Sequence, residues 1–407
     1  MAADGIAQVR YLANGILKKS GSKSASISVR IKKGLLVRFT NNGVHQNGFQ
    51  DLAFYTLCMQ TKKGPVYIES NDWIPKRGLT PFGLKSKECF PFDLNKTPEM
   101  AGEAIEKALR KIRSHRASAN GYYSAFQRFF YFANSRGEEM FHPATAVRFG
   151  VTATKGEGKG YLSFYHPDTR QLDVTDTVEG ALALAERAAV KGIQINPGVY
   201  ECVFSPRAIL EFIEPLRRHF DAHLTQDKKS VFSGRVGKKI FSDTFSLSDD
   251  ITHPCQFGIP FDAEGVPKQK VELIKKGVLH GLLREGHSTR GILEHPFYPE
   301  NLVIKGGTLS LADIFKKIRR GIFINKIWYH TLVRESKMEV TGLATAGSLF
   351  IEKGKIKGRA VNLRYHDSLF SILRSVLGCS REQILLKDGE RGAALFPYLW
   401  VSHLRVL

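Results

Sequence analysis

Short apolar runs separated by turn sequences occupy residues 25 to 63, and this pattern limits the possible folds more than any other feature of the chain. The runs ISVRI, LLVRF and FYTLCM alternate with Lys-Lys-Gly and Asn-Asn-Gly. Apolar alternation is typical of half-buried strands, and Asn-Gly between two such runs is a strong hairpin signal. We therefore expect an antiparallel sheet in this part of the chain.

Three helices are expected after this sheet. The first begins near residue 97, where Thr-Pro-Glu supplies a cap, a first-turn proline and an early acid. The second covers 121–134 (GYYSAFQRFFYFAN), whose seven aromatic residues favour a helix buried against the sheet. Stacking on unpaired bases, beside the basic run RKIRSHR, is the alternative for this segment. The third is the alanine-rich stretch 176–191.

The glycine-rich stretch KGEGKG, residues 155–160, is interpreted as a hairpin loop between two strands. It lacks the G-K-[ST] ending and the following helix of a phosphate-binding loop. GIQINPG then reads as a linker, which predicts two domains, 1–192 and 193–407. Short strands and turns dominate the second half, interrupted by a capped helix at 310–320. The predicted fold class is α+β, with a mainly antiparallel second domain shaped as a curved sheet or partial barrel.

Charge is the unusual part of the composition. Sixty Lys and Arg against 39 Asp and Glu give a net charge of +21, which can attract nucleic acid, an acidic membrane or an acidic protein. The five widely spaced cysteines form no C-x-x-C pair and suit reduced thiols. No signal peptide and no apolar stretch of about 20 residues is apparent, so a soluble, cytoplasmic protein is expected.

The segment ILEFIEPLRRHFDAHL, 209–224, places His219 and His223 four residues apart on an expected helix. In the H-E-x-x-H zinc helix, two such histidines bind the metal and the adjacent glutamate activates water. Here Phe220 stands in the place of that glutamate, and Pro215 favours a kink just before the pair. Two histidines at a half-buried helix edge are the preferred interpretation, and a zinc site is the alternative.

Other groupings of reactive side chains are short and local. One loop gathers possible metal ligands that are also common turn formers, a second offers an acid pair, and a third places a nucleophile beside a histidine. A turn explains the first two as well, and sequence neighbours rarely form a productive dyad. The possible metal ligands are Asp249, Asp250, His253 and Cys255. The acid pair is Asp262 and Glu264, and the third loop contains His287, Ser288 and Thr289.

Ordered blocks of the second half resemble the TldD and PmbA (TldE) family, also called the modulator of DNA gyrase family. The blocks are VYECVFSP, SVFSGRVGKKI, SDD, PFDAEGV, LIKKGVLHGLL, PENLVIKGG, RGIFI and GSLFIEKGKIKGRAVN. VRFTNNGVHQN, residues 37–47, is similar to the family's N-terminal strand and turn. The resemblance extends from about residue 25 to the C-terminus and is weakest between 113 and 160.

The resemblance implies a two-domain α/β protein that forms dimers around a protected cleft. The TldD type is a zinc metallopeptidase with an H-E-x-x-x-H helix and a C-terminal cysteine ligand, and the TldE type lacks them. In this chain the metal helix corresponds to IEPLRR, where Glu214 keeps the glutamate position and Ile213 and Arg218 replace the histidines. The C-terminal segment KDGERGAALFP, 387–397, has no cysteine, and Cys379 lies too early.

The chain is therefore expected to be a TldE-like subunit that binds no cofactor and completes a peptide-processing protease with a zinc-bearing TldD-like partner. A self-sufficient zinc peptidase using His219 and His223, a homodimer and a basic nucleic-acid-binding protein remain alternatives, and no membrane association is expected. The resemblance also suggests a peptide or partner surface. It consists of Asn41, Asn42, His45, Phe261, Asp262, Glu264 and Gly265.

Overall fold

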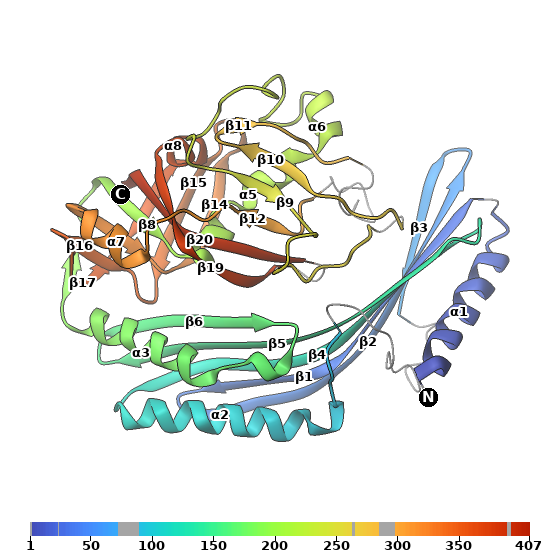
Figure 1. Ribbon diagram of the computed structural model, residues 1–407, viewed down its shortest axis with the longest axis horizontal. Coiled ribbons are helices and arrows are strands. Elements are labelled where there is room, and N and C mark those ends of the chain that lie inside the picture. The colour runs from blue at the N-terminus through green and yellow to red at the C-terminus, as the bar shows by residue number, and fades with distance from the viewer. Residues whose placement is uncertain (1, 23, 72–88, 263–264, 285–297, 389–391) are drawn as a thin grey trace.

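The computed structural model describes residues 2–22, 24–71, 89–262, 265–284, 298–388 and 392–407. A curved sheet with helices on its outer face forms the first half, and a larger open sheet forms the second half above it (Figure 1). The α+β class is thus confirmed. The second sheet is mixed and does not close into a barrel: β12–β20, β8–β13 and β7–β17 are parallel pairs.

The first half contains α1 (Ala2–Lys19), β1 (Ala25–Thr40), β2 (Gly43–Thr61), β3 (Gly64–Ser70), α2 (Thr97–Ser114), β4 (Ser118–Asn134), β5 (Glu139–Lys155), β6 (Gly158–His166) and α3 (Val174–Ala189). The described strands are ordered β3-β2-β1-β4-β5-β6, and every neighbouring pair is antiparallel. The antiparallel sheet and the helices near 97 and 176 are confirmed.

The second half contains β7 (Gly192–Gln194), β8 (Gly198–Phe204), α4 (Pro206–Phe212), α5 (Glu214–Arg217), α6 (Ala222–Gln226), β9 (Leu247–Asp249), β10 (Val271–Lys275), β11 (Val278–Leu279), β12 (Leu302–Ile304), α7 (Leu311–Lys317), β13 (Arg320–Ile324), β14 (Lys326–Arg334), β15 (Glu339–Thr345), β16 (Leu349–Glu352), β17 (Lys355–Val361), β18 (Arg364–Ser368), α8 (Leu369–Arg374), β19 (Val376–Asp388) and β20 (Gly392–Val406). Its described strands run β11-β10-β9-β12-β20-β8-β13-β16-β17-β7, and β20 also pairs with β18 and β19.

The prediction of a helix at 121–134 is wrong, because this segment is strand β4. Its outward side chains, such as Tyr123 and Tyr131, are buried under helices, whereas Phe126 and Phe130 are buried on the inner face. Burial on both faces removes the polar alternation that identifies a strand, so periodicity alone cannot distinguish it from a buried helix. The expected burial of the aromatic residues is nevertheless confirmed.

The Asn-Asn-Gly turn between β1 and β2 is exposed at Asn41 and half-buried at Asn42, and it is fixed by its backbone conformation and side-chain bonds. Asn41 and Asn42 have φ angles of 51° and 63°, as the favoured hairpin turn requires. The Asn42 side chain donates to the carbonyl of Ala117 at 3.1 Å and accepts from the N–H of Ala119 at 2.8 Å, which joins the hairpin to the start of β4. His45 is exposed on β2 just beyond the turn.

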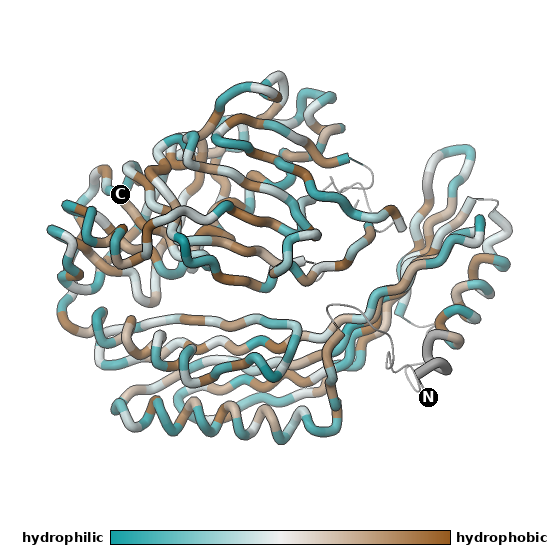
Figure 2. Tube along the Cα trace, in the orientation of Figure 1, coloured by the Kyte–Doolittle hydropathy of each residue, from teal (hydrophilic) through white to brown (hydrophobic). Residues whose placement is uncertain are grey.

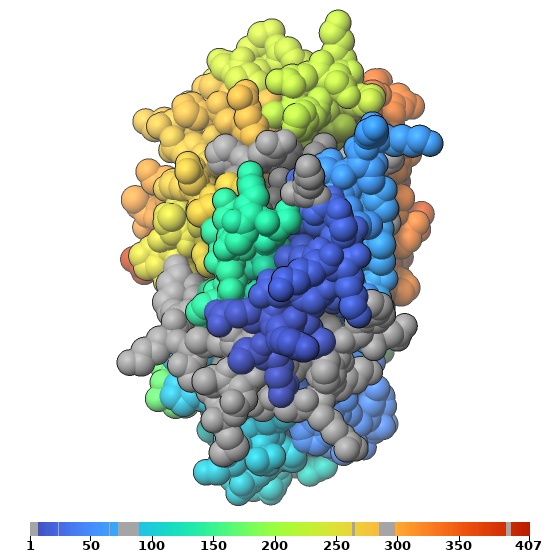
Figure 3. Space-filling model, turned by 90° about the vertical axis from the view of Figure 1, so that its right-hand side faces the viewer, coloured from blue at the N-terminus to red at the C-terminus, as the bar shows by residue number. Residues whose placement is uncertain are grey.

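Helix α1 was not predicted from the sequence. It covers the end of the first sheet near the turn between β4 and β5. Its buried residues Val9, Ala13 and Leu17 pack against the outer face of β1 and β4. In Figure 3 it lies beside the turn between β4 and β5, where the Arg10 guanidinium contacts the Glu139 carboxylate at 2.6 Å. On α2, hydrophilic residues face away from the sheet (Figure 2).

Helix α3 packs directly on β6 because Gly158 and Gly160 of the KGEGKG stretch have no side chains to separate them. The expected hairpin loop is confirmed, and Gly156 occupies its turn with a φ of 54°. A Cβ atom at Gly158 or Gly160 would overlap the carbonyl oxygens of Ala185 or Ala181 on α3. The glycines therefore serve close packing of a helix on a strand.

Gly160→Ala is expected to lower the free energy of unfolding by about 3 kcal/mol, because α3 must move away from β6 to admit the new methyl group. Gly102→Ala is the matched control. Gly102 lies in α2 with no heavy atom within 4 Å of the added Cβ, so that variant should gain roughly 0.5–1 kcal/mol. Chemical denaturation measures both values, and a Gly160→Ala protein as stable as the wild type would contradict this packing.

Candidate functional site

The segment predicted as one helix at 209–224 is divided into short pieces. Ser205 caps α4, whose last residue is Phe212, because Pro215 has no N–H to bond the Glu211 carbonyl. After α5 and one 3₁₀ turn, Asp221 adopts an extended conformation, forms a bridge with Leu283 and caps α6. The expected break near Pro215 is confirmed, and the single continuous helix is wrong.

As a result, His219 and His223 do not share a helix face. His219 is fully buried against the Phe232 ring, and its Nδ1 accepts from the Val231 N–H at 3.4 Å. Burial lowers the pKa of His219, which favours the neutral imidazole. His223 is exposed on α6. This geometry favours a structural role for His219 and disfavours the two-histidine zinc site.

Glu214 lies on α5 in a cluster that we call the Arg217 cluster, which consists of Glu214, Arg217 and Tyr298. The Arg217 side chain is 5% exposed and donates to Glu214 Oε2 at 3.1 Å and to the Pro299 carbonyl oxygen. Its guanidinium stacks on the Tyr298 ring, 4.2 Å from the centroid, and the Tyr298 hydroxyl contacts Glu214 Oε1. Both carboxylate oxygens of Glu214 are therefore engaged.

The two residues that the family resemblance places at the histidine positions differ in their surroundings. Ile213 is 2% exposed and belongs to the main hydrophobic core of the second half. The Arg218 side chain is half exposed, and its guanidinium is 3.7 Å from the Glu335 carboxylate. An isoleucine supplies no ligand atom, and two neighbouring guanidinium groups oppose a divalent cation, so these residues do not fit zinc.

A buried ion pair lies next to the Arg217 cluster. The Lys268 ammonium contacts the Glu300 carboxylate, and their side chains are 1% and 13% exposed. Asp249 is also buried and accepts from the N–H of Asn301 at 2.8 Å. Burial raises the pKa of Asp249 to about 6, although the Lys268 charge and the Asn301 N–H act in the opposite direction. Lys268 and Tyr298 were not predicted, because they are 32 and 84 residues from their partners Glu300 and Glu214. Arg217 was not predicted either, although it lies only three residues after Glu214.

The other predicted groupings separate into local turns. Asp250 accepts from Thr252 and pairs with Lys270 at 2.9 Å, whereas His253 Nδ1 accepts from the N–H of Cys255. Within the described ranges, no three His, Cys, Asp or Glu side chains form a metal-binding group. The proposed dyad residues lie outside the described residues, as does part of the segment 387–397. The dyad residues are His287, Ser288 and Thr289.

The PFDAEG loop lies against the inner face of the first sheet. Phe261 packs with Phe130 and Phe132, and Asp262 Oδ1 accepts from the N–H of Val266 at 2.9 Å. Gly265 has a φ of 79° and leaves no room for a Cβ beside the Phe132 ring. Glu264 lies outside the described residues. The loop thus holds the two halves together.

Cys379 lies on β19, outside this loop. Burial raises the pKa of its thiol to about 12, which disfavours a thiolate ligand.

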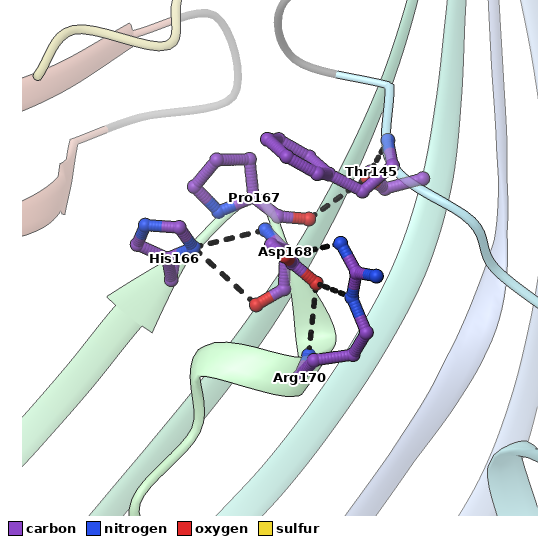
Figure 4. Close-up of polar contacts among 6 residues, drawn as sticks. Thr145, His166, Pro167, Asp168 and Arg170 are labelled. Atoms are coloured by element: carbon purple, nitrogen blue, oxygen red, sulfur yellow. Dashed lines mark hydrogen bonds and ion pairs between the residues drawn. The ribbon is translucent and has the colours of Figure 1, made fainter.

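A second polar cluster, unforeseen from the sequence, lies at the end of β6 (Figure 4). The Asp168 N–H donates to His166 Nδ1 at 3.0 Å, and the Arg170 guanidinium holds the Asp168 carboxylate with two bonds of 2.9 and 2.8 Å. These bonds lower the pKa of Asp168, and burial lowers the pKa of His166. The His166 ring meets Phe257 edge-on, with 5.5 Å between centroids, so the cluster forms a joint between the halves.

The architecture is shared with solved structures. The fold is similar to that of TldE from Thermococcus kodakarensis, with a TM-score of 0.82 and 18% identity. The similarity covers 97% of this chain and 99% of the TldE chain. The fold is also similar to that of a Thermotoga maritima protein described as a putative modulator of a DNA gyrase. The TM-score is 0.79 and the identity is 17%, over 98% of this chain and 99% of that chain. The chain thus has a metallopeptidase-like α+β fold.

The PmbA/TldA metallopeptidase C-terminal domain matches residues 197–407, and the chain belongs to the PmbA/TldD family. A metalloprotease of Methanothermobacter thermautotrophicus is 27% identical over 216 residues, 47% of each protein. The Haemophilus influenzae metalloprotease TldD homolog is 25% identical over 162 residues, 35% of this chain and 32% of that protein. The chain spans less than half the length of these curated relatives. The family resemblance is confirmed.

Among the described residues, no helix is long and apolar enough to cross a membrane.

Asp249→Asn is expected to flatten the pH dependence of stability between about pH 4 and pH 6. A carboxyl with a raised pKa binds its proton more tightly in the folded protein, so the wild type loses stability as the pH rises through this window. One pKa unit is worth about 1.4 kcal/mol, which limits the loss to about 3 kcal/mol. The free energy of unfolding, measured at about pH 4 and about pH 6, gives this loss of stability. The exposed Asp243→Asn is the matched control, and a wild-type slope retained in Asp249→Asn would contradict the assignment.

Proposed function

We propose that this chain is the non-catalytic, TldE-like subunit of a peptide-processing protease and that a zinc-bearing TldD-like subunit supplies the chemistry. The observation that carries the proposal is the Arg217 cluster. A metallopeptidase needs a glutamate free to take a proton from metal-bound water. In this chain the corresponding Glu214 is held by an arginine and a tyrosine, and Ile213 is part of the core.

Family membership supports the remainder of the proposal. Two curated relatives are named metalloproteases, and a similar solved structure is a TldE protein. A chain that keeps this fold but has unsuitable residues in the metal helix suits a supporting role in a shared cleft. We also propose that residues 1–192 and 193–407 are its two domains, with the boundary directly after α3.

Mixing the purified chain with a TldD-like protein from the same genome is expected to give a stable heteromer. Size-exclusion chromatography with light scattering measures the assembly, and hydrolysis of an unstructured peptide measures activity. Peptidase activity should appear in the mixture and in neither protein alone. Separate elution of the two proteins, or an unchanged rate on mixing, would refute the proposal.

Metal analysis separates this function from a self-sufficient zinc peptidase. The chain purified without chelators is expected to carry far less than one zinc per molecule, because the positions of the metal helix hold Ile213 and Arg218. If stoichiometric zinc is found, His223→Ala is the decisive variant, since His223 is exposed and its replacement leaves the core intact. Zinc that disappears in this variant would establish the rival function.

A further inference from the structure

A cavity of about 300 Å³ lies on the second sheet, over β9 and its neighbours β10 and β12 (Figure 1). Side chains alternate along β9, so that Leu247 packs in the main core of the second half, whereas Ser246 and Ser248 line the cavity on the opposite face. The volume is at the lower limit of the roughly 300–1,000 Å³ that small-ligand sites occupy. The cavity therefore suits a compact ligand.

Lysines outnumber carboxylates in the lining of this cavity, which we call the Ser246 cavity. The charged residues of the lining, His253 apart, are Lys270, Lys275, Lys276, Lys305, Asp250 and Glu272. Lys270 contacts Asp250 at 2.9 Å, and Lys275 contacts Glu272 at the same distance. Lys276 and Lys305 form no ion pair with any described residue. The cavity thus has an excess of two positive charges, which attracts an anion.

Backbone bonds join both of these lysines to Ser246. The Lys305 N–H donates to the Ser246 carbonyl oxygen at 3.2 Å, and the Lys276 N–H donates to Ser246 Oγ at 3.0 Å. Because Ser246 Oγ accepts this bond, its own hydrogen remains available to donate. Ser248 adds a second hydroxyl two residues further along β9. The cavity therefore combines two lysines without carboxylate partners and two hydroxyl donors.

The backbone of the turn between β10 and β11 fixes the position of Lys276. Lys276 and Gly277 have φ angles of 46° and 75°, as a tight hairpin turn requires. The Gly277 N–H donates to the Phe245 carbonyl oxygen at 2.9 Å, and the Gly277 carbonyl oxygen accepts from the N–H groups of Ile240 and Phe241 at 2.8 and 3.0 Å. Because this turn is held before a ligand arrives, less entropy is lost on binding.

The residue types in the lining match a phosphate group. A phosphate monoester near neutral pH carries about 1.5 to 2 negative charges and three strong acceptor oxygens, which suits two lysines and two hydroxyl donors. Lysine binds phosphate as a point charge, whereas the planar arginine fork provides two-bond recognition of a carboxylate. The described lining contains neither an arginine nor an aromatic ring on which a nucleobase could stack.

We propose that the Ser246 cavity binds a compact phosphate group, either inorganic phosphate or the phosphate of a small monoester. Lys276 and Lys305 supply the opposite charge, and the hydroxyls of Ser246 and Ser248 donate to the phosphate oxygens. The cavity shares no residue with the Arg217 cluster, and the inference goes beyond the proposed function. Because the site can be titrated in this chain alone, its test is independent of heteromer formation.

Calorimetric titration of the full chain with inorganic phosphate, glycerol phosphate and acetate at matched ionic strength tests the proposal. At least one of the two phosphates is expected to bind one per chain and about tenfold more tightly than acetate, the effect of one additional charge-assisted contact. Binding of glycerol phosphate alone would identify the ligand as a monoester. Equal affinities for phosphates and acetate would overturn the proposal. So would a single-stranded oligonucleotide that binds when neither small phosphate does.

Lys305→Gln should weaken phosphate binding about tenfold, because it removes one charge-assisted contact from an exposed position. Lys357→Gln is the matched control, since Lys357 is exposed on β17 of the same sheet and does not line the cavity. Ser248→Ala should also weaken binding without changing the melting temperature. Equal weakening in the two lysine variants would show general charge attraction and overturn the proposal. Unchanged affinity in both Lys305→Gln and Ser248→Ala would place the anion elsewhere, with the same consequence.

Discussion

The burial of β4 on both faces is the constraint on which the rest of the structure depends. Its outer face lies under the helices of the first half, where Tyr123 and Tyr131 are almost fully buried. Its inner face meets the second half through Phe126 and Phe132. Because aromatic side chains bury large apolar areas, one strand can supply core to both halves. The same strand buries Arg128 on this inner face, where its guanidinium lies over the Phe126 and Phe130 rings.

Helix α3 provides the second connection between the halves. Its alanines face β6, where Gly158 and Gly160 permit close approach, whereas Ala188 belongs to a hydrophobic cluster with Val203 and Leu349 of the second sheet. A helix that packs closely on both sides needs small side chains on each side, which explains the alanine content of α3. The chain passes directly from α3 into β7, which pairs with β17. The proposed domain boundary therefore lies beside a shared core element, and rigid coupling of the halves is expected.

Local signals in the sequence predicted elements whose causes are local. The β1–β2 hairpin follows from an Asn-Asn-Gly turn, and α2 follows from its early proline and helical spacing. Secondary structure that depends on distant partners was predicted wrongly. Burial on both faces removes the polar alternation of β4, and the expected 209–224 helix is divided where Asp221 pairs with Leu283. Family resemblance located Glu214, but its partner Tyr298 is 84 residues away. The pairs that define the chemistry of the site are formed only by the fold.

The Arg217 cluster also indicates that histidines introduced at positions 213 and 218 would not by themselves create a metal centre. A histidine at position 213 would place a polar ring in the core that Ile213 fills, which costs the free energy of burying a polar group. The Arg217 guanidinium would remain beside Glu214 and repel a divalent cation. Removing Arg217 in turn would leave the Pro299 carbonyl oxygen and the Tyr298 ring without this partner. Several mutually dependent contacts therefore separate this segment from a zinc-binding form, and single substitutions there are expected to be strongly non-additive.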